Sequence, residues 1–572
     1  MKSSDRKFGL SGYTLDIFFD KVVRTYAGRP ALAMAGETPF TYAEFGERVR
    51  SLRQGLAARG VRKGDKVAIL GTGSPNWGVA FLAVTTMGAV AVPVMEDFPE
   101  SDIDHILAHS DAIAIFISAA LHQSLNLNNL RKLAHVIRLD DFASLSGTDG
   151  DDGLWAQIQR LPKRIMRSIS KPAPAEAPGP GEDDLAEILY TSGTTGQSKG
   201  VMLTHGNLVS NLFEGPDLLG VIDQNSVALA FLPMAHAFGS TSAFLSLIYR
   251  GCAIHYLGKK PSPKILMAAM KEVRPHIIGA VPLVFEKIYH KQVLPALYEK
   301  KVLRWLARSR AGRRTVHRIV GRRIMRGFGG RLKCAIIGGS GLNPEVESFL
   351  REARIPFSVG YGLSECSPLV TFSSIPGSRM GSAGKAVTGV SIRIADPDPG
   401  TGIGEILVKG PSVMKGYYKD EAETLKAFTA DGWLRTGDRG YLDEDGFLYV
   451  KGRSKNVIVG PSGENIYPEV IEEKIKESLF VEEALVYRAR NELVARVYPD
   501  YGYIQCLESG KDEPSIASNI ALLLESVRAE VNRKLAPASR IRKIVEQTEP
   551  FLKTPTNKIK RAEYVPDDLA QA

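Results

Sequence analysis

The sequence predicts an α/β protein with more than one domain. Its 572 residues exceed what a single hydrophobic core normally holds. Strand-like and helix-like segments alternate between about residues 203 and 370, as at 228–232, 276–281 and 334–337. This alternation is typical of layered sheets covered by helices. A hydrophobic content of 44% and a charged content of 24% are ordinary for a soluble globular protein.

The first hundred residues contain an apolar segment that could be mistaken for a membrane span. Residues 77–95 carry no charge, but Gly88 and Pro93 interrupt them. A strand-like run precedes the segment, and Ser74 and Pro75 are suited to the N-cap and first turn of a helix. The pattern therefore predicts strand, helix and strand in a buried core rather than a transmembrane helix.

Turn and linker residues divide the rest of the chain. Residues 171–181 are rich in proline, alanine and glycine, which predicts a linker. Asn343 and Pro344 are placed to begin a helix, and Asp445-Gly446 between alternating apolar positions predicts a β-hairpin. A smaller segment of helices and strands follows to the C-terminus.

The cysteines and the N-terminus indicate an intracellular protein. The four cysteines lie far apart without a Cys-x-x-Cys pair, which argues against a zinc site or a disulfide framework and suits a reducing cytosol. Residues 1–9 have no apolar core and do not resemble a signal peptide. The sequence therefore predicts a cytoplasmic location.

The net charge of +10 comes from one segment, since residues 300–333 contain 13 Lys and Arg and no Asp or Glu. A second basic run, 160–171, also alternates with apolar residues. No nucleic-acid motif accompanies either run, so we expect no nucleic-acid partner. A helix lying on an anionic membrane surface and a solvated helical face both account for the pattern.

The most informative segment is residues 190–200, Tyr-Thr-Ser-Gly-Thr-Thr-Gly-Gln-Ser-Lys-Gly. It follows a strand-like run, and its glycines let the backbone approach a bulky anion. Hydroxyls, backbone N–H groups and a lysine together suit phosphate oxygens. The spacing differs from that of the common P-loop. We interpret this segment as a nucleotide-binding loop rather than an ordinary surface loop.

Four further segments follow in a characteristic order: Tyr-Gly-Leu-Ser-Glu at 361–365, Gly-Trp-Leu-Arg-Thr-Gly-Asp at 432–438, Gly-Arg-Ser-Lys at 452–455, and Lys-Thr-Pro-Thr-Asn-Lys at 553–558. Together with the loop they resemble the adenylate-forming superfamily of acyl-CoA synthetases, peptide-synthetase adenylation domains and beetle luciferases. The resemblance covers the chain from about residue 191 to 558.

The resemblance implies a fold in two parts. A large N-terminal domain, residues 1–452, would contain two layered sheets with helices and a β-barrel. A small mobile α+β domain, residues 453–572, would be joined to it at a hinge at Lys455.

The resemblance also implies an ATP site with Mg²⁺. The phosphate loop would hold the β- and γ-phosphates through Thr191, Ser192, Gly193, Thr194, Thr195, Gly196 and Lys199. Other residues expected in the nucleotide site are Gly339, Tyr361 against the adenine, Gly362, Ser364, Asp438 on the ribose hydroxyls, and Arg453. Glu365 and Thr191 would be catalytic residues and metal ligands, since Mg²⁺ prefers hard oxygen donors.

Three further residues are expected to act on the acyl group and the thiol. Lys558 would be the catalytic lysine that bridges the α-phosphate and the carboxylate, although Asn557 stands where the family usually has glycine. His236 would lie beside the acyl pocket, and Gly463 would line the tunnel for the thiol of CoA.

The resemblance is strongest to bacterial long-chain fatty-acid–CoA ligases, on the segments 281–289 and 461–468 and the basic insertion. We therefore expect ATP-dependent activation of a fatty acid to acyl-AMP, followed by transfer to CoA. An acyl-carrier-protein ligase, a ligase for another acid, a lipid-binding scaffold of the same fold and a kinase are the alternatives. The chain length, the acceptor and the oligomeric state stay open.

Overall fold

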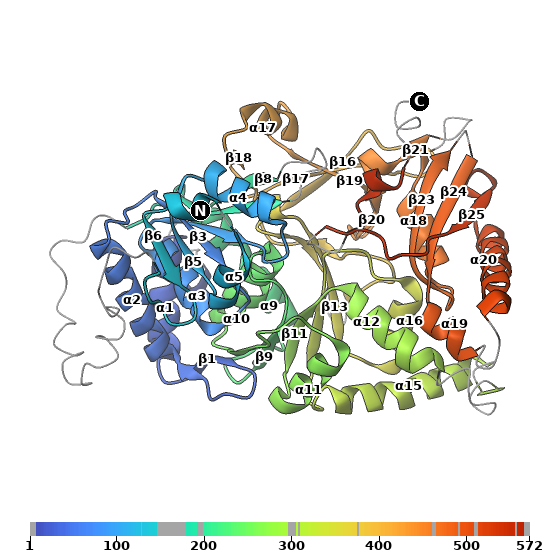
Figure 1. Cartoon of the computed structure of the whole chain (residues 1–572), viewed down its shortest axis with the longest axis horizontal. Coiled ribbons are helices and arrows are strands. Elements are labelled where there is room, and N and C mark those ends of the chain that lie inside the picture. The colour runs from blue at the N-terminus through green and yellow to red at the C-terminus, as the bar shows by residue number, and fades with distance from the viewer. Residues whose placement is uncertain are drawn as a thin grey trace.

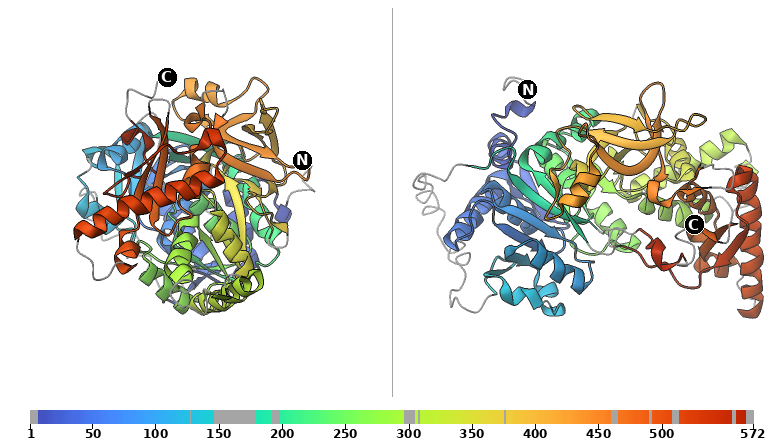
Figure 2. Two further views of the ribbon diagram at one scale, coloured as in Figure 1. Left: turned by 90° about the vertical axis from the view of Figure 1, so that its right-hand side faces the viewer. Right: turned by 90° about the horizontal axis from the view of Figure 1, so that it is seen from above.

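The computed structural model describes most of the chain and shows an elongated molecule with a large and a small part (Figures 1 and 2). The residues that it does not describe are 1–6, 127, 146–178, 192–197, 296–304, 307–308, 375–376, 460–464, 490–491, 508–512, 555–557 and 566–572. Most of the predicted linker and the basic run 160–171 therefore lie outside the described residues.

A seven-stranded sheet forms the first layer of the large part, in the order β18-β8-β7-β4-β3-β5-β6. Its central strands are parallel, while β7 and β8 form an antiparallel pair. The strands are β3 (Lys66–Leu70), β4 (Val90–Val94), β5 (Ala112–Ile117), β6 (His135–Arg138), β7 (Leu185–Thr191), β8 (Lys199–Thr204) and β18 (Gly416–Tyr417). The strands predicted before and after the helix are confirmed as β3 and β4.

A nine-stranded sheet forms the second layer, in the order β15-β14-β13-β12-β11-β9-β10-β1-β2. Its parallel centre contains the three strands predicted between residues 228 and 337. The strands are β1 (Pro30–Met34), β2 (Phe40–Thr41), β9 (Val227–Ala230), β10 (Ala253–Tyr256), β11 (Ile277–Ala280), β12 (Cys334–Ile337), β13 (Phe357–Gly362), β14 (Leu369–Phe372) and β15 (Lys385–Ala386).

The first part of the apolar segment forms helix α3 (Pro75–Thr86), which lies in the core shared by both sheets. All residues from Trp77 to Thr86 are buried, because α3 contacts other helices and strands of both sheets. Ser74 caps the helix by accepting a hydrogen bond from the N–H of Trp77 at 3.2 Å, as predicted. Among the described residues, no helix is both long and apolar enough to cross a membrane.

Helices cover the two sheets on their outer faces (Figure 1). Asn343 caps α16 by accepting from the N–H of Glu345 at 2.8 Å, which confirms the predicted helix start. Helix α16 spans Pro344–Ala353, and the other α-helices described in the large part are α1 (Leu15–Tyr26), α2 (Tyr42–Ala58), α4 (Glu100–His109), α5 (Ala119–Ser124), α8 (His205–Asn211), α9 (Glu214–Leu219), α10 (Ser246–Tyr249), α11 (Pro263–Val273), α12 (Pro282–Ile288), α15 (Arg310–Gly327) and α17 (Glu421–Ala427).

The expected β-barrel is not closed in the described residues, which is a correction to the prediction from resemblance. Four antiparallel strands form an open sheet instead, in the order β16-β17-β19-β20. They are β16 (Ser391–Ala395), β17 (Gly404–Lys409), β19 (Leu434–Leu442) and β20 (Leu448–Arg453). Closure requires the edge strands to pair with a regular stagger, whereas β20 leads the chain into the small domain and does not pair with β16. The predicted hairpin around Asp445-Gly446 joins β19 and β20.

The small C-terminal domain has its own hydrophobic core, drawn from residues between 466 and 544. A three-stranded sheet, β23-β24-β25, packs against α18 and α20. The elements are β21 (Ile458–Val459), β22 (Asn465–Ile466), α18 (Pro468–Ile475), β23 (Val481–Ala489), β24 (Glu492–Pro499), α19 (Tyr501–Leu507), α20 (Glu513–Lys534) and β25 (Lys543–Glu546). Lys455 is exposed in a short turn between the domains, and the boundary at 452/453 and the hinge stay predictions.

Helices α15 and α16 pack closely because Gly321 has no side chain. A Cβ at Gly321 would lie 2.7 Å from both the Cβ and the carbonyl oxygen of Ala353. We expect Gly321→Val to destabilise the protein by about 1–3 kcal/mol, the usual cost of overpacking, and to lower its melting temperature.

Arg323→Val is the matched control, since it places the same side chain at an exposed position of the same helix. Equal melting temperatures of the two variants would mean that the close approach of α15 and α16 at Gly321 does not contribute to the stability of the protein.

Candidate active site

The carboxylate of Asp438 lies at the centre of a cluster of predicted site residues. Asp438 and Arg453 are partners across the antiparallel pair β19–β20. Arg453 Nε lies 2.8 Å from one carboxylate oxygen of Asp438, and the hydroxyl of Tyr361 donates to the other at 2.7 Å. Asp438 is buried, with 6% of its surface exposed. Three motifs that are 77 and 15 residues apart in the chain are thus joined at one side chain.

Burial and nearby charges shift the pKa values of Tyr361 and Arg453, the two partners of Asp438. Burial, followed by the negative charge of Asp438, raises the pKa of Tyr361 well above its usual value. The phenol therefore stays protonated and keeps its hydrogen bond. Burial alone would lower the pKa of Arg453, but Asp438 and other nearby acidic groups raise it. Arg453 therefore stays positively charged.

Glu365 lies just after β13, in a short helical turn that Ser364 begins. The hydroxyl of Tyr417 donates to Glu365 Oε1 at 3.1 Å, and within the described part of the chain no other group bonds the Glu365 carboxylate. Ser364 is buried beside it, with 9% exposed. One carboxylate oxygen of Glu365 is therefore available to an external cation.

The predicted phosphate loop is the connection of a β-hairpin. Thr191, the last residue of β7, pairs with Lys199, the first residue of β8. The loop residues between them that were assigned to ATP lie outside the described residues: Ser192, Gly193, Thr194, Thr195 and Gly196. The hairpin accounts for the position of both ends of the loop.

Lys199 is held by residues that the sequence analysis did not identify. Its ammonium forms an ion pair with Glu423 of α17 and lies 5.4 Å from the centre of the Tyr417 ring. Hydrogen bonds from Lys199 and then Lys426 lower the pKa of Glu423 to about 2. No local pattern marks Tyr417 or Glu423, because each meets the site from more than 200 residues beyond Lys199.

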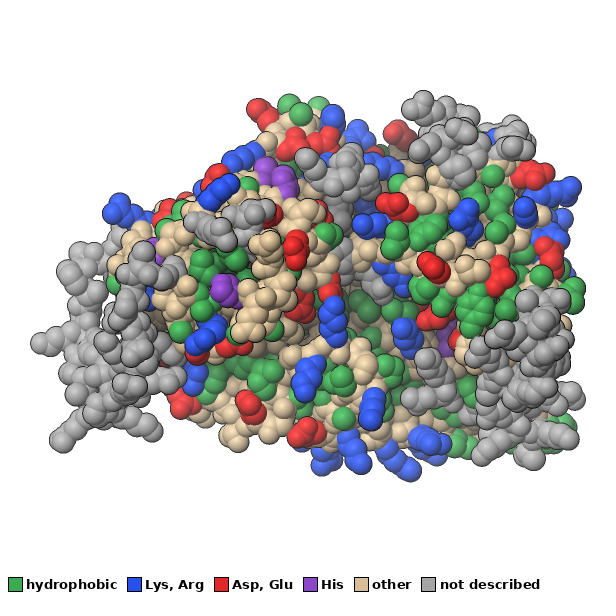
Figure 3. Space-filling model, in the orientation of Figure 1, with side chains coloured by type: hydrophobic (Ala, Val, Ile, Leu, Met, Phe, Trp, Pro, Cys, Tyr) green, Lys and Arg blue, Asp and Glu red, His purple; other side chains and the backbone are tan. Residues whose placement is uncertain are grey.

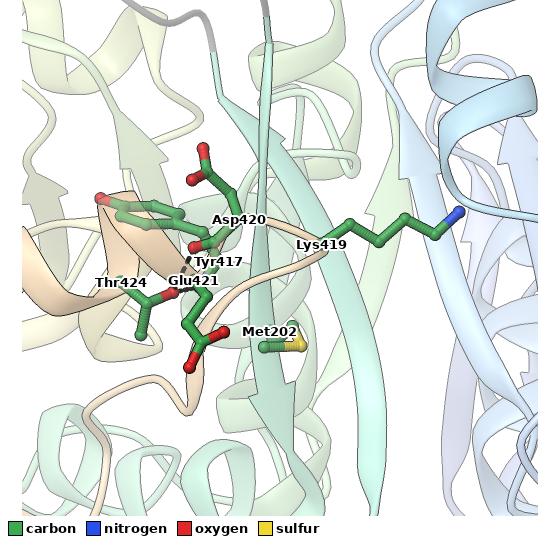
Figure 4. Close-up of a pocket in the computed structure, with 6 residues that line it drawn as sticks. All are labelled: Met202, Tyr417, Lys419, Asp420, Glu421 and Thr424. Atoms are coloured by element: carbon green, nitrogen blue, oxygen red, sulfur yellow. Dashed lines mark hydrogen bonds between the residues drawn. The ribbon is translucent and has the colours of Figure 1, made fainter.

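A hollow of about 430 Å³ lies beside this hairpin (Figure 4). Figure 4 shows Tyr417 and Lys419 extending in opposite directions from the same short segment. The backbone N–H of Tyr417 donates to Thr424 at 2.8 Å, which fixes the start of α17 against β18. Tyr417 is the one residue that the hollow shares with the cluster around Glu365.

The backbone geometry explains why glycine occupies two of the predicted site positions, Gly362 and Gly339. A Cβ at Gly362 would lie 2.0 Å from the carbonyl oxygen of Pro368, so no larger residue fits. Gly339, in the turn after β12, has φ of +94°, a conformation that favours glycine. Both are therefore required for the shape of the loops that border the site.

His236 and Lys558 lie in the same surroundings as the acidic cluster. Burial, followed by the positive charge of Lys558, lowers the pKa of His236 to about 4. Its Nδ1 accepts a hydrogen bond from the N–H of Phe238 at 3.2 Å. The imidazole is therefore neutral near pH 7 and faces a cation rather than an anion.

Lys558 is solvent-exposed at the edge of the cluster. The surrounding protein and the charge of Arg453 lower its pKa, while Asp438 and Glu365 raise it. The structure thus brings this lysine of the small domain near residues of the large domain. Gly463, the residue predicted to line the thiol tunnel, lies outside the described residues.

The segment that carries Lys558 is anchored to the small domain on both sides. Lys553 forms an ion pair with Glu483, and the N–H of Thr554 donates to the carbonyl of Lys558 at 2.7 Å. Beyond Lys558, Arg561 Nη2 lies 2.5 Å from Glu472 Oε2. These contacts hold the segment against β23 and α18.

Comparison with known proteins identifies the family of the chain. A model of the family described as AMP-binding enzyme matches residues 19–418. The chain belongs to this family. The match includes the phosphate hairpin, Glu365 and Tyr417, and it ends before Asp438, Arg453 and Lys558.

Relatives of the family resemble the chain over most of its length. A long-chain-fatty-acid–CoA ligase, FadD15 of Mycobacterium bovis, is 31% identical over 78% of this chain and 75% of its own. The long-chain-fatty-acid–CoA ligase 6 of Mus musculus is 29% identical over 80% of this chain and 67% of its own.

Two solved structures share the fold. The anthranilate CoA ligase AuaEII in complex with anthranoyl-AMP has a TM-score of 0.76 at 19% identity, covering 98% of both chains. ATP-bound MatB of Rhodopseudomonas palustris has a TM-score of 0.72 at 23% identity, covering 96% of this chain and 98% of its own. The two-part α/β architecture is therefore that of adenylate-forming enzymes.

We expect Arg561→Ala to loosen the Lys558 segment, because it leaves the buried Glu472 carboxylate without its cation. Removing one partner of a fully buried pair costs roughly 3–5 kcal/mol; Arg561 is partly exposed, so about 2 kcal/mol is the expected loss. Hydrogen–deuterium exchange of residues 551–565 should become at least tenfold faster.

Arg542→Ala is the control, since it removes an ion pair with Glu492 in the same domain that is largely exposed. Unchanged exchange in Arg561→Ala would show that this pair does not anchor the segment.

Proposed function

We infer that this protein is an AMP-forming ligase that joins a long-chain fatty acid to coenzyme A at the cost of ATP. The acid would react with ATP to give acyl-AMP and pyrophosphate, and the thiol of CoA would then displace AMP. The observation that supports this most strongly is the convergence of Glu365, Asp438, Arg453 and Lys558, in a chain whose relatives include long-chain-fatty-acid–CoA ligases.

Activation through AMP solves a problem of reactivity. A carboxylate is a poor electrophile, and its oxygen does not leave as oxide. Linking it to AMP creates a phosphate leaving group. The protein must align the carboxylate with the α-phosphorus and neutralise the charge that develops, which is a task of positioning and electrostatics.

Lys558 has the properties that this first step requires. We propose that its ammonium contacts the α-phosphate and the attacking carboxylate together. The surrounding protein and Arg453 lower the pKa of Lys558, while its neighbours Asp438 and Glu365 oppose that shift and favour the charged form. The exposed position of Lys558 leaves the ammonium accessible to a substrate. The lysine is therefore proposed to stabilise the negative charge of the transition state.

Asp438 and Arg453 are proposed to bind the ribose. The two oxygens of Asp438 already accept from Tyr361 and Arg453, but an ionised carboxylate has about four acceptor positions. It can therefore still accept hydrogen bonds from the two ribose hydroxyls. Tyr361 would lie against the adenine while its hydroxyl holds Asp438 in place.

The residues present fit one Mg²⁺ held mainly by the substrate. Among the described residues there is no group of three or more His, Cys, Asp or Glu that could hold a metal ion alone. Mg²⁺ in phosphate-transfer sites commonly takes one or two protein oxygens and completes its shell with phosphates and water. Glu365 is proposed to supply one oxygen and Thr191 another, and the bound ion would neutralise phosphate charge.

The phosphate loop is proposed to bind the β- and γ-phosphates through Thr191, Ser192, Gly193, Thr194, Thr195, Gly196 and Lys199. Lys199 already holds an anion, the carboxylate of Glu423. This ion pair supports the proposal that its ammonium can bind a negatively charged group. Binding of ATP would exchange the carboxylate for phosphate oxygens.

His236 is proposed to border the acyl chain. Its pKa of about 4 keeps the ring uncharged at neutral pH, so it does not place a cation beside an apolar chain. For the second step, the small domain would turn about Lys455 and bring Gly463 to the thiol tunnel, with a domain boundary at 452/453.

We propose a cytoplasmic enzyme that attaches reversibly to anionic membranes, where fatty acids concentrate. Exposed basic side chains are mixed with exposed Trp305 (68%) and Ile319 (55%) near α15. Each basic residue near an anionic surface contributes about 1 kcal/mol. The attachment would therefore weaken as salt concentration rises.

We expect Lys558→Ala to slow acyl-AMP formation by 10²–10³, or roughly 3–4 kcal/mol, because it removes one contact to the developing charge. Thioester formation from supplied acyl-AMP should be nearly normal. Pyrophosphate release measures the first step, and acyl-CoA produced from synthetic acyl-AMP measures the second.

Lys560→Ala is the control, since this exposed lysine lies two residues away and changes the charge equally. If the second step is slowed as much as the first in Lys558→Ala, the role proposed for this lysine is wrong.

We expect a strong preference for long acyl chains, because each buried CH₂ contributes about 0.8 kcal/mol. A series of acids from acetate to stearate should show kcat/KM rising steeply toward palmitate with CoA as acceptor. AMP rather than ADP should accumulate, which distinguishes ligation from kinase activity.

The same series with acyl carrier protein tests the alternative acceptor. Faster transfer to acyl carrier protein than to CoA would change the proposed acceptor. Comparable values for acetate and palmitate, or an optimum on an aryl acid, would contradict the long-chain assignment.

A further inference from the structure

Four arginines surround a hollow of about 410 Å³ between α15 and the end of α16. Arg318, Arg322 and Arg326 are spaced four residues apart on α15 and therefore share one face of the helix. Arg354, the C-cap of α16, faces them from the other side. Met325, Gly330 and Ala353 complete the lining, and it contains no acidic residue.

The close approach at Gly321 creates this arrangement. Because Ala353 packs directly against Gly321, the last turn of α16 lies beside the middle of α15. Arg354 then leaves the helix with φ of +59°, in the left-handed region. The chain thus places a fourth guanidinium next to three others instead of directing it away.

The seven arginines of α15 differ in their partners. Arg313 Nη2 and Arg314 Nε lie 2.8 Å and 3.9 Å from Glu352 Oε1, so these two arginines share one negative charge. Within the described residues, no ion pair joins Arg318, Arg322 or Arg326 to any Asp or Glu, and the same holds for Arg354. The basic segment 300–333 is therefore not a uniform charged face.

Four like charges around one hollow repel one another, and a bound anion would relieve that repulsion. Guanidinium groups are planar and can donate two parallel hydrogen bonds, which suits them to phosphate oxygens. The side chains are exposed and can therefore reach a ligand. Figure 3 shows basic side chains gathered along the lower edge of the molecule, where α11 and α15 run.

The hollow is separate from the nucleotide site. Gly339 lies just before α16, whereas Arg354 lies just after it. Ten helical residues at 1.5 Å each place these two ends about 15 Å apart. The four arginines are therefore not the residues proposed to hold ATP.

We propose that this hollow is a second phosphate-binding site, which takes the phosphate of a lipid headgroup or of a soluble phosphorylated molecule. The exposed apolar side chain of Ile319 lies on the same helix, which suits the boundary between headgroups and acyl chains. The proposal concerns binding and does not depend on the proposed ligase activity.

The test compares two doubly substituted full-length proteins with equal net charge. Arg318→Glu/Arg322→Glu reverses two charges in the hollow. Arg310→Glu/Arg323→Glu reverses two exposed charges of the same helix that do not line it. Arg318→Gln/Arg322→Gln is a milder variant that tests the site if charge reversal disturbs folding.

Two probes distinguish the sources of phosphate. In the first arm, proteins are sedimented with phosphatidylcholine vesicles that contain or lack phosphatidylglycerol. In the second arm, melting temperature is followed as inorganic phosphate replaces chloride at constant ionic strength. We expect the hollow variants to bind phosphatidylglycerol vesicles at least tenfold more weakly than the control variant.

A selective loss on vesicles identifies the lipid headgroup, and a selective loss of stabilisation by phosphate identifies a soluble ligand. Equal behaviour of the hollow and control variants in both arms would overturn the site, since general charge would then explain the binding. Acyl-CoA formation from detergent-dispersed acid should match that of the unsubstituted protein in all variants. Failure of the unsubstituted protein in that assay would overturn the ligase proposal alone.

Discussion

The candidate site depends on one buried carboxylate, that of Asp438. A buried carboxylate is costly unless it is paired and hydrogen-bonded. Arg453 supplies the charge and Tyr361 the hydrogen bond, so the free energy of burial is offset by joining β13, β19 and β20. Removal of Asp438 would take this partner from both Arg453 and Tyr361. The same contacts leave acceptor positions on the carboxylate for a ligand.

The site is shared by two domains with separate cores. The large domain holds Glu365 and Asp438, Arg453 ends β20 at the predicted domain boundary, and the small domain supplies Lys558 from an anchored turn. The positive charge of Lys558 acts on His236 of the large domain by lowering its pKa, after the larger effect of burial. A domain that carries its own core can change orientation without losing its fold, and this is the property that a two-step reaction at one site would use.

The pairing of opposite charges also distinguishes the basic residues on the surface of α15. Glu352 pairs with Arg313 and Arg314 on α15, whereas the four arginines around the hollow have no acidic partner in the described residues. Composition alone shows an excess of basic residues in 300–333. The position of one glutamate decides which of these arginines are paired, and the position of one glycine brings four unpaired arginines together.

Local patterns were sufficient to predict several elements. Ser74 and Pro75 mark the start of α3, and Asn343 marks the start of α16. The apolar runs predicted as strands form β3, β7 and β12. These features depend on backbone chemistry within a few residues, which a sequence displays directly. The motifs that contain Glu365, Asp438, Arg453 and Lys558 likewise identified the residues that the structure brings together. The prediction of a β-barrel was wrong for the described residues, where the four strands form an open sheet. Whether edge strands pair depends on the geometry of the whole sheet, which no single strand sequence specifies.

Only the tertiary structure decided which side chains meet. Glu423 holds Lys199 from 224 residues away, Tyr417 binds Glu365 from 52 residues away, and Arg354 faces α15 because Gly321 admits Ala353. Such contacts depend on how separate elements pack, and neither the periodicity of the sequence nor the spacing of its motifs predicts them. The sequence by itself therefore determined the elements, the family motifs and the class of chemistry. The fold determined which of the charged groups are paired and which remain available to a ligand.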